Sequence, residues 1–370
     1  MRVTDELYIG VMSGTSLDAV DVCAVSIRDQ TEVIASNSFD IPPQIRQSIA
    51  ELCTPGNDEI HRMSILDNQL AQLFSTNINS LVNTNHIDRK KIVAIGCHGQ
   101  TVRHMPNNAT PYTLQIGNGA SIALLTGITT ITDFRRADIA AGGQGAPLVP
   151  AFHQSIFSNT DKNRVILNIG GMANITIINK HEDSISGFDT GPGNVLLNEW
   201  ISHIKNCEYD RNGDWSAEQP PDTELLDLML KEQYFHTPPP KSTGRELFNL
   251  SWIGEQLSTL NREIDPAIIQ STLCELSART ICEAILNTAP NTEELIVCGG
   301  GVHNKNLMEK IETICGIKTK SSTDFGIDPD FVEAAAFAWL AKQTLNNIPA
   351  NAPSVTGAKK HVVLGAIYPN

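Results

Sequence analysis

Hydrophobic and polar residues alternate in two strand–turn–strand patterns, one near the N-terminus and one near the middle of the chain. The first is YIGVMSGTSLDAVDVCAV, which begins at Tyr8, and the second is VILNIGGMANITII, which begins at Val165. In each pattern a run of strand-forming residues leads into a turn of small residues, after which the alternation resumes. The sequence therefore predicts two β-hairpins with glycine in their turns.

These turns have the composition of a phosphate-binding loop. Glycine lets backbone N–H groups approach phosphate oxygens closely, although either hairpin alone is equally well explained as a tight turn. The first hairpin adds the hydroxyl groups of Ser13, Thr15 and Ser16 and the carboxylates of Asp18 and Asp21. The two hairpins together favour nucleotide binding, with two halves of the protein holding one polyphosphate.

Helical periodicity and short apolar runs fill the sequence between the hairpins. We predict helices at about 44–53 and 58–83 and a strand at 92–95. Such alternation of helices and strands is typical of α/β proteins. Because 370 residues are many for a single hydrophobic core, we expect two domains.

A domain boundary is expected near residues 130–137. The segment AAGGQGAPLVP follows there, and its glycines and prolines do not fit a regular helix or a central strand. The last segment, HVVLGAIYP, has the pattern of a strand that returns to the first half. The predicted domains are residues 1–132, together with a C-terminal strand at about 358–370, and residues 133–357.

Composition narrows the classes of partner. The formal net charge of −14 disfavours nucleic acid and anionic membranes as partners, but it leaves an anionic small molecule possible. The N-terminus lacks the apolar stretch of a signal peptide, and no apolar run is long enough to span a bilayer, so we predict a cytoplasmic protein. The eight cysteines lack zinc-site spacing and are expected to be reduced.

The segment GFDTGPGNVLLNEWISHI contains a candidate catalytic carboxylate. We predict that a strand ends at Asp189 and that a helix begins near Asn194, with an apolar face formed by Leu197, Trp200, Ile201 and Ile204. Asp189 would then lie beside the positive end of a helix, which favours the ionised form that a general base requires. Alternatively, Asp189 closes the turn by accepting backbone N–H groups.

Three further segments are ambiguous. The glycines at 299–301 follow a strand and could support a flat adenine, or could simply form a strand-to-helix turn. Glu333 lies opposite the apolar stripe of a helix that begins near Asp328, a position typical of a solvated face. Arg135 belongs to the charged segment TDFRRAD, which could bind a polar ligand or form surface ion pairs. Neither a Walker-type phosphate loop nor a dinucleotide fingerprint is present in the sequence.

Eight segments are distinctive when taken together: MSGTSLDAVDV, GCHGQTVRH, LQIGNGASIA, TDFRRADIAAGGQGAPLVPAFH, NIGGMANIT, GFDTGPGN, PPKSTGRELFN and CGGGVHNKNLM. From about Tyr8 to Ala341, this set closely resembles the anhydro-N-acetylmuramic acid kinases. That family belongs to the superfamily of actin, sugar kinases and heat-shock chaperones. The resemblance implies an α/β protein with two actin-like (ribonuclease H-like) domains around an interdomain ATP cleft. A duplication of this kind would leave a repeated hairpin in the sequence.

The resemblance also implies a reaction, the ATP-dependent conversion of 1,6-anhydro-N-acetylmuramic acid to N-acetylmuramic acid 6-phosphate in cell-wall peptidoglycan recycling. A carboxylate matching Asp189 activates water for attack on the anomeric carbon. The bridging oxygen then leaves that carbon and takes the γ-phosphoryl group of ATP. Most of the help in phosphoryl transfer comes from positioning and charge neutralisation, which the glycine turns and Mg²⁺ would provide.

The expected site residues fall into three sets. Asp18 is expected to hold Mg²⁺, through water. The nucleotide is expected to contact Gly14, Thr15, Ser16, Leu17, Asp18, Ala19, Val20, Asp21, Gly170, Gly171, Asn174, Gly299 and Gly300. The sugar is expected to contact His98, Gly99, Gln100, Arg135 and Glu333.

Two positions depart from the family pattern. Ala19 stands where relatives commonly carry glycine, and Glu218-Gln219 stands where a small residue and glycine are usual.

Two other functions compete with the anhydro-sugar kinase. One alternative is an ordinary sugar kinase, in which Asp189 deprotonates a free hydroxyl. The other is a nucleotide-switched binding module, which would show no sugar-dependent turnover. Homodimers are usual in the family.

Overall fold

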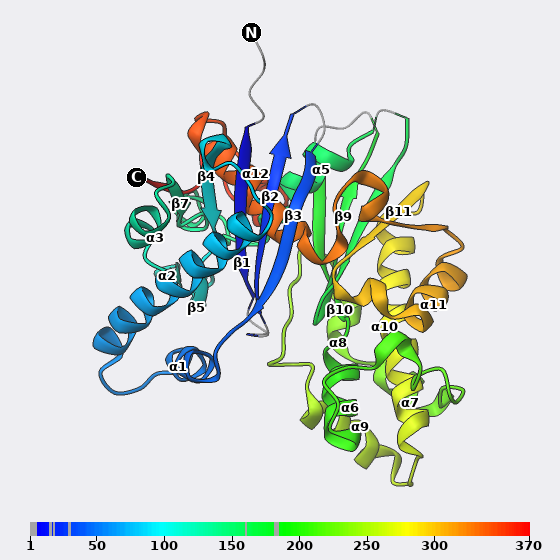
Figure 1. The fold of residues 1–370 in the computed structure, drawn as a ribbon. Coiled ribbons are helices and arrows are strands. Elements are labelled where there is room, and N and C mark those ends of the chain that lie inside the picture. The colour runs from blue at the N-terminus through cyan, green and yellow to red at the C-terminus, as the bar shows by residue number, and fades with distance from the viewer. Residues whose placement is uncertain (1–5, 15–16, 18, 29–30, 160, 181–184) are drawn as a thin grey trace. The chain divides into compact units, whose positions relative to one another are not determined.

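The computed structural model describes residues 6–14, 17, 19–28, 31–159, 161–180 and 185–370. The chain forms two compact units, the first made of residues 1–156 and 326–370 and the second of residues 157–325. Figure 1 labels their helices and strands.

The first unit contains a six-stranded sheet, a small two-stranded sheet and several helices. Its strands are β1 (Leu7–Ser13), β2 (Ala19–Ile27), β3 (Thr31–Asp40), β4 (Ile92–Cys97), β5 (Gln100–Met105), β6 (Tyr112–Ile116), β7 (Thr130–Thr132) and β13 (Ala366–Tyr368). Its helices are α1 (Pro43–Leu52), α2 (Glu59–Thr84), η1 (Arg89–Lys91), α3 (Gly119–Thr126), α4 (Arg136–Ala140), α5 (Val149–Phe157, which ends at the boundary), η5 (Pro329–Phe331), α12 (Val332–Leu345) and α13 (Pro353–Thr356).

The second unit contains a five-stranded sheet with most of its helices following β10 and β11. Its strands are β8 (Arg164–Ile169), β9 (Met172–Ile178), β10 (Ile185–Pro192), β11 (Glu294–Cys298) and β12 (Thr319–Ser321). Its helices are α6 (Val195–Lys205), η2 (Arg211–Gly213), α7 (Thr223–Met229), α8 (Gln233–His236), α9 (Leu250–Leu260), α10 (Pro266–Thr288), η3 (Gly300–His303), α11 (Lys305–Cys315) and η4 (Ser322–Phe325).

The two main sheets repeat one topology. In the first, β1, β2 and β3 form an antiparallel meander, and β4 and then β7 continue the sheet from β1 in parallel. In the second, β8, β9 and β10 form the meander, and β11 and then β12 continue it in parallel. The predicted pair of related α/β domains is therefore confirmed.

Most predicted elements lie within a few residues of their expected positions. Both hairpins form, and the helices expected at 44–53 and 58–83 are α1 and α2. The C-terminal strand does return to the first half, because β13 pairs antiparallel with β7.

The division of the chain differs from the predicted boundaries at 132/133 and 357/358. The glycine-rich segment after residue 140 is held within the first unit, where Asp138 accepts the N–H group of Gly145 at 2.7 Å and the N–H group of Gln144 donates to Thr356 at 2.8 Å. Helix α12 also packs on β1 and β4. The first unit therefore extends to residue 156 and resumes at residue 326.

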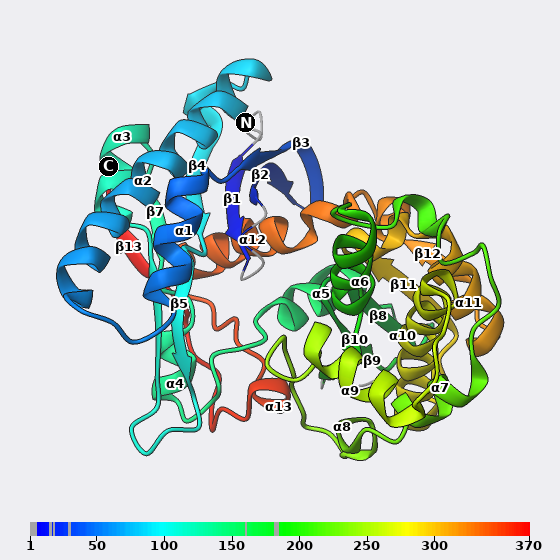
Figure 2. The ribbon, with the colours of Figure 1, turned by 90° about the horizontal axis from the view of Figure 1, so that it is seen from below.

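Helix α12 and the pair α1 and α2 cover opposite faces of the first sheet (Figure 2). A Cβ atom at Gly10 would overlap the carbonyl oxygen of Ala334, and one at Gly96 would overlap that of Phe337. Only glycine allows so close an approach between a helix and strand backbones. This contact places the first turn of α12, which contains Glu333, directly on the sheet.

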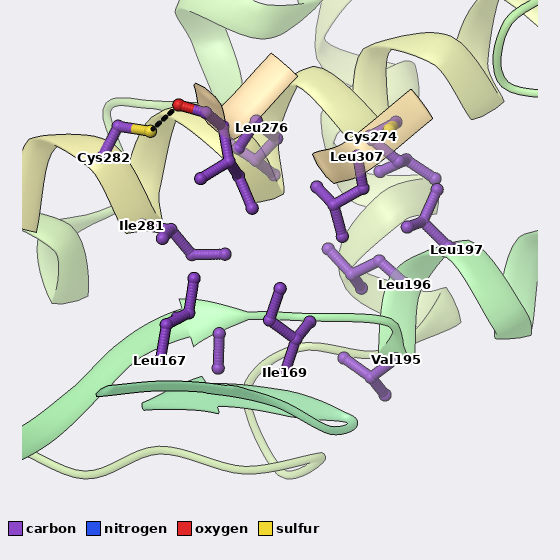
Figure 3. Close-up of a cluster of buried hydrophobic side chains, with 14 of the residues drawn as sticks. Leu167, Ile169, Val195, Leu196, Leu197, Cys274, Leu276, Ile281, Cys282 and Leu307 are labelled. Atoms are coloured by element: carbon purple, nitrogen blue, oxygen red, sulfur yellow. Dashed lines mark hydrogen bonds between the residues drawn. The ribbon is translucent and has the colours of Figure 1, made fainter. Parts of the chain in front are cut away.

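The core of the second unit lies between one face of its sheet and helices α6, α10 and α11. Figure 3 shows Leu167 and Ile169 of β8 directed toward Ile281, Val195 and Leu307, all of them buried. Side chains of a strand alternate between faces, so Asn168, between Leu167 and Ile169, faces away from this core.

The structure also describes the state of the cysteines and the character of the helices. All eight cysteines are free thiols, and six of them are buried. No helix in the described ranges combines the length and the apolar character needed to cross a bilayer.

Candidate active site

The turn of the first hairpin is held by the segment that follows β4. The Ser13 hydroxyl donates to Oε1 of Gln100 at 2.6 Å, and Nε2 of Gln100 donates to the carbonyl oxygen of Gly14 at 3.3 Å. Gln100, a predicted sugar contact, is thus buried and bonded to the predicted nucleotide turn. Thr15, Ser16 and Asp18 lie outside the described residues.

The two departures from the family pattern have simple structural contexts. Ala19 lies in β2, paired with Asp40, and Leu17 is the described residue of this turn that has a left-handed conformation, with φ of 60°. Alanine at position 19 therefore meets no backbone restriction. Glu218 and Gln219 are exposed.

His98 and Arg135 form a buried polar pair in the first unit. The N–H group of His98 donates to Val11, and its ring lies 4.8 Å from that of Phe337 of α12. Nε of Arg135 donates to Nε2 of His98 at 3.0 Å, and Nη1 donates to the carbonyl oxygen of Gly145 at 2.8 Å. Burial, and secondly the charge of Arg135, lower the pKa of His98 to about 3, so the imidazole is neutral at physiological pH.

Glu333 joins this group, although its helical position is typical of a solvated face. Its side chain is only partly accessible, and burial raises its pKa. The nearby charge of Arg135 opposes this rise, whereas that of Asp21 adds to it. Glu333, Arg135, His98 and Asp21 therefore form one polar cluster, although β2, the loops after β4 and β7, and α12 supply them from distant parts of the sequence.

A polar cavity of about 220 Å³ adjoins this cluster within the first unit. It lies beyond the carboxyl ends of β4 and β7, where α/β sheets commonly bind ligands. Its lining is formed by Asp67, His98, Gly99, Gln115, Ile116, Gly117, Asn118, Gly119, Thr132, Asp133, Arg136 and Tyr368. Of the predicted sugar contacts, His98 and Gly99 line it directly.

Three polar side chains form a row across the sheet of the second unit. Asn168 pairs with Asn174, and Asn174 pairs with Asp189, so the three lie on the face opposite the hydrophobic core. Asn174 and Asp189 are among the site residues predicted from the sequence, whereas Asn168 is not. Asn168 could have been found from the sequence, because it is a polar residue inside the otherwise apolar run VILNI.

The carboxylate of Asp189 is partly enclosed by the loop after α8. Its Oδ2 accepts the N–H group of Thr243 at 3.1 Å. Burial raises the pKa of Asp189 to about 6, since the lowering effect of the Thr243 N–H group is smaller and the charge of Glu246 adds to the rise. The group is therefore mainly ionised at neutral pH but can accept a proton. Sequence reasoning missed Thr243, although the segment PPKSTGRELFN belongs to the resemblance.

The pKa of Asp189 is raised rather than lowered as expected beside a helix N-terminus, because burial is the largest cause of its shift. Strand β10 continues past Asp189 to Pro192. The first amides of α6 bind the glycine turn of the second hairpin instead: Asn194 donates to Gly170 at 2.9 Å and Val195 donates to Gly171 at 3.0 Å. The predicted apolar face of α6 is also shorter than expected, since Ile204 is 39% exposed.

The three consecutive glycines after β11 have a packing role at two positions. A Cβ atom at Gly299, which has φ of 80°, would overlap the side-chain oxygen of Asn168, and one at Gly301 would overlap Ile169. Gly300 is exposed. An adenine contact at Gly299 and Gly300 stays a prediction.

The duplicated topology, with a glycine-containing hairpin turn in each half, defines a protein of the actin and sugar-kinase superfamily fold. The family model described as "Anhydro-N-acetylmuramic acid kinase" matches residues 6–370. The chain belongs to this family, and membership in a kinase family implies the use of ATP.

Relatives that carry the name of this family align with nearly the whole chain. The anhydro-N-acetylmuramic acid kinase of Shewanella pealeana is 46% identical over 369 residues, which cover 99% of this chain and 100% of the relative. That of Shewanella sp. (strain ANA-3) is 48% identical over 363 residues, 98% of each chain.

Solved structures show more distant similarity. The activator of 2-hydroxyisocaproyl-CoA dehydratase from Clostridium difficile has a TM-score of 0.47 and 11% identity, covering 92% of this chain and 98% of its own. A ROK family glucokinase from Streptomyces griseus has a TM-score of 0.40 and 11% identity, covering 91% of this chain and 99% of its own.

Proposed function

We propose that this protein opens 1,6-anhydro-N-acetylmuramic acid with water and phosphorylates it at the expense of ATP. Asp189 takes a proton from water, whose oxygen bonds to the anomeric carbon. The bond from that carbon to the bridging oxygen breaks, and the bridging oxygen attacks the γ-phosphorus as ADP leaves. The products are N-acetylmuramic acid 6-phosphate and ADP, a step in peptidoglycan recycling.

The observation that carries this proposal is the environment of Asp189. One carboxylate oxygen, Oδ2, is oriented by the Thr243 N–H group, and no hydrogen bond from a described residue reaches Oδ1. A pKa of about 6 leaves the group ionised at neutral pH yet basic enough to accept a proton from water.

The polar cluster of the first unit suits binding rather than proton transfer. His98 is neutral and bonded to Arg135, and burial lowers the pKa of Arg135 only to about 10, so the guanidinium keeps its charge. We propose that His98, Gly99, Arg135 and Glu333 contact polar groups of the sugar, and that Gln100 supports them by holding the hairpin turn.

The nucleotide and its metal are assigned to the two hairpins. We propose that Gly14 to Asp21 contact the phosphates with Gly170, Gly171 and Asn174, and that Gly299 and Gly300 contact the adenosine. Mg²⁺ is commonly held by one or two carboxylates, water and substrate phosphates. Asp18 is the proposed carboxylate, and Asp21 on β2 offers the same chemistry close by. Mg²⁺ would neutralise charge on the transferred phosphoryl group. We also propose that the protein is cytoplasmic and forms a homodimer.

The test is ADP release from Mg-ATP with and without 1,6-anhydro-N-acetylmuramic acid, repeated in ¹⁸O-labelled water. Release that requires the anhydro sugar, with labelled oxygen on the anomeric carbon of the product, supports the proposal. Turnover of free sugars without label would indicate an ordinary sugar kinase. Slow release that ignores sugars would indicate a nucleotide-switched module.

A further inference from the structure

One short segment of the second unit contacts Asp189 at three points. The Tyr234 hydroxyl donates to the backbone carbonyl oxygen of Asp189 at 2.7 Å. The backbone N–H group of Asp189 donates to the carbonyl oxygen of Lys241 at 3.2 Å, and the N–H group of Thr243 donates to Oδ2 at 3.1 Å. Both the peptide groups and the carboxylate of Asp189 are therefore held by residues 234–243.

Lys241 fixes this segment on α8. Its ammonium group donates to the carbonyl oxygens of Tyr234 at 3.0 Å and Phe235 at 3.2 Å, and it lies 4.7 Å from the centre of the Tyr234 ring. A cation bonded to the last carbonyl groups of a helix and placed over an aromatic face is well stabilised. The Tyr234 ring also packs edge-on against the buried Phe248. Tyr234 and Lys241 thus tie the loop to the core.

This arrangement restricts the carboxylate without neutralising it. A backbone N–H group stabilises Oδ2, and Oδ1 accepts no hydrogen bond from any residue in the described ranges. We propose that Tyr234 and Lys241 are positioning residues, which hold Asp189 so that Oδ1 is directed at the proton it removes. The inference rests on the proposed role of Asp189 as the base.

Three charged or titratable groups surround Asp189 in this arrangement. The charge of Glu246 raises the pKa of Asp189, and the charge of Asp189 in turn raises that of Tyr234, which burial already raises, so the phenol stays protonated as a donor. Burial lowers the pKa of Lys241. Release of the segment would expose the carboxylate, and because burial is the largest cause of the raised pKa, the pKa of Asp189 would fall toward its ordinary value despite the loss of the Thr243 N–H group.

The variants that test this inference are Tyr234→Phe, which keeps the ring and removes only the hydroxyl, Lys241→Met and Lys241→Arg. The matched controls are Tyr209→Phe, at a tyrosine that is 54% exposed, and Lys231→Met, at an exposed lysine of the same unit. For each protein we would measure kcat, KM for ATP, the pH profile of kcat/KM and the melting temperature. A ¹³C-labelled aspartate titration would give the pKa of Asp189 without turnover.

We expect Tyr234→Phe to lower kcat about 10-fold to 100-fold, as a small misplacement of a catalytic group does, with KM for ATP changed less than about twofold. Lys241→Met should lower kcat and, by exposing the carboxylate, move both the Asp189 titration and the acid limb of the profile to lower pH, and Lys241→Arg should restore most of the activity. Both controls should behave as the unchanged protein.

Unchanged kcat in Tyr234→Phe and Lys241→Met, or a loss matched by the unfolded fraction alone, would overturn the inference. An Asp189 titration that Lys241→Met leaves in place would overturn it too, even if the unchanged protein has no kinase activity. Absence of sugar-dependent turnover in the unchanged protein would refute the proposed function instead.

Discussion

The two sheets carry different side chains at equivalent positions next to their hairpin turns. In the first unit the row across the meander is Met12, Asp21 and Ser38, and in the second it is Asn168, Asn174 and Asp189. The carboxylate thus lies on the middle strand of the first meander but on the outer strand of the second. The last paired residues of the first hairpin, Ser13 and Val20, are also further apart in the sequence than those of the second, Ile169 and Ala173.

The difference agrees with the two roles proposed for the carboxylates, binding for Asp21 and proton transfer for Asp189. Asp21 accepts a hydrogen bond from the Ser38 hydroxyl at 2.7 Å and lies near Glu333, whose other charged neighbour is Arg135, in a cluster suited to binding. Among the residues that the structure describes, one N–H group, that of Thr243, reaches the carboxylate of Asp189, and the pKa of Asp189 is raised, which suits proton transfer. The position of a carboxylate in its row therefore does not decide its chemical role. The elements that pack over each sheet decide it, because they set the burial and the hydrogen-bond partners of the carboxylate.

The largest effect on activity is expected from the loss of Asp189. We expect Asp189→Asn to lower kcat by at least about 10³-fold, because the amide cannot accept the proton, while ATP affinity changes little. Sugar-dependent ADP release and equilibrium nucleotide binding measure the two effects. Asp227→Asn, at an exposed aspartate of α7, is the control. Loss of nucleotide binding together with activity would mean that Asp189 is structural.

Loss of Arg135 should affect binding rather than proton transfer. Arg135→Met leaves His98 and the carbonyl group of Gly145 without their donor, so we expect KM for the anhydro sugar to rise about 10-fold to 100-fold, at a rough cost of 1–3 kcal/mol per lost charged hydrogen bond. Removal of the positive charge should also raise the pKa of His98, measurable by NMR titration. Arg62→Met, at a surface ion pair, is the control. A fall in kcat with unchanged KM would contradict this assignment.

The pH dependence of kcat/KM should distinguish the proposed base, Asp189, from His98 of the polar cluster. Because Asp189 must be ionised to act as a base and its pKa is about 6, kcat/KM should fall about tenfold per pH unit below that value. His98 stays neutral throughout this range, so it should add no second limb. A profile flat from pH 7 to pH 5 would argue against Asp189 as the base.

The smallest effect is expected at Ser38, the counterpart of Asp189 in the first row. Ser38→Ala removes one exposed hydrogen bond to Asp21, so the free energy of unfolding should fall by about 0.5 kcal/mol and kcat should change less than about twofold. Denaturant unfolding and steady-state kinetics check this. A large loss of kcat would show that the two rows share the chemistry after all.

Much of the local structure follows from sequence patterns. The alternation at the hairpins, the periodicity of α1 and α2 and the strand at β4 indicated elements that form within a few residues of the expected positions. These features depend on neighbouring residues, so a linear pattern records them. The segment GFDTGPGN likewise drew attention to Asp189 as a candidate base, with closure of the turn as the alternative role.

Contacts between distant segments decided the rest. Glycines at positions 10 and 96 let α12 lie on the first sheet, which brings Glu333 near Arg135 and Asp21 although its helical position resembles a solvated face. Loop 234–243 covers Asp189, and the resulting burial raises a pKa that a helix N-terminus alone would lower. The sequence by itself determined the hairpins, the repeated α/β pattern and the candidate base. Only the tertiary structure decided the charge state and partners of the site residues, because burial and electrostatic interactions depend on which distant segments pack together.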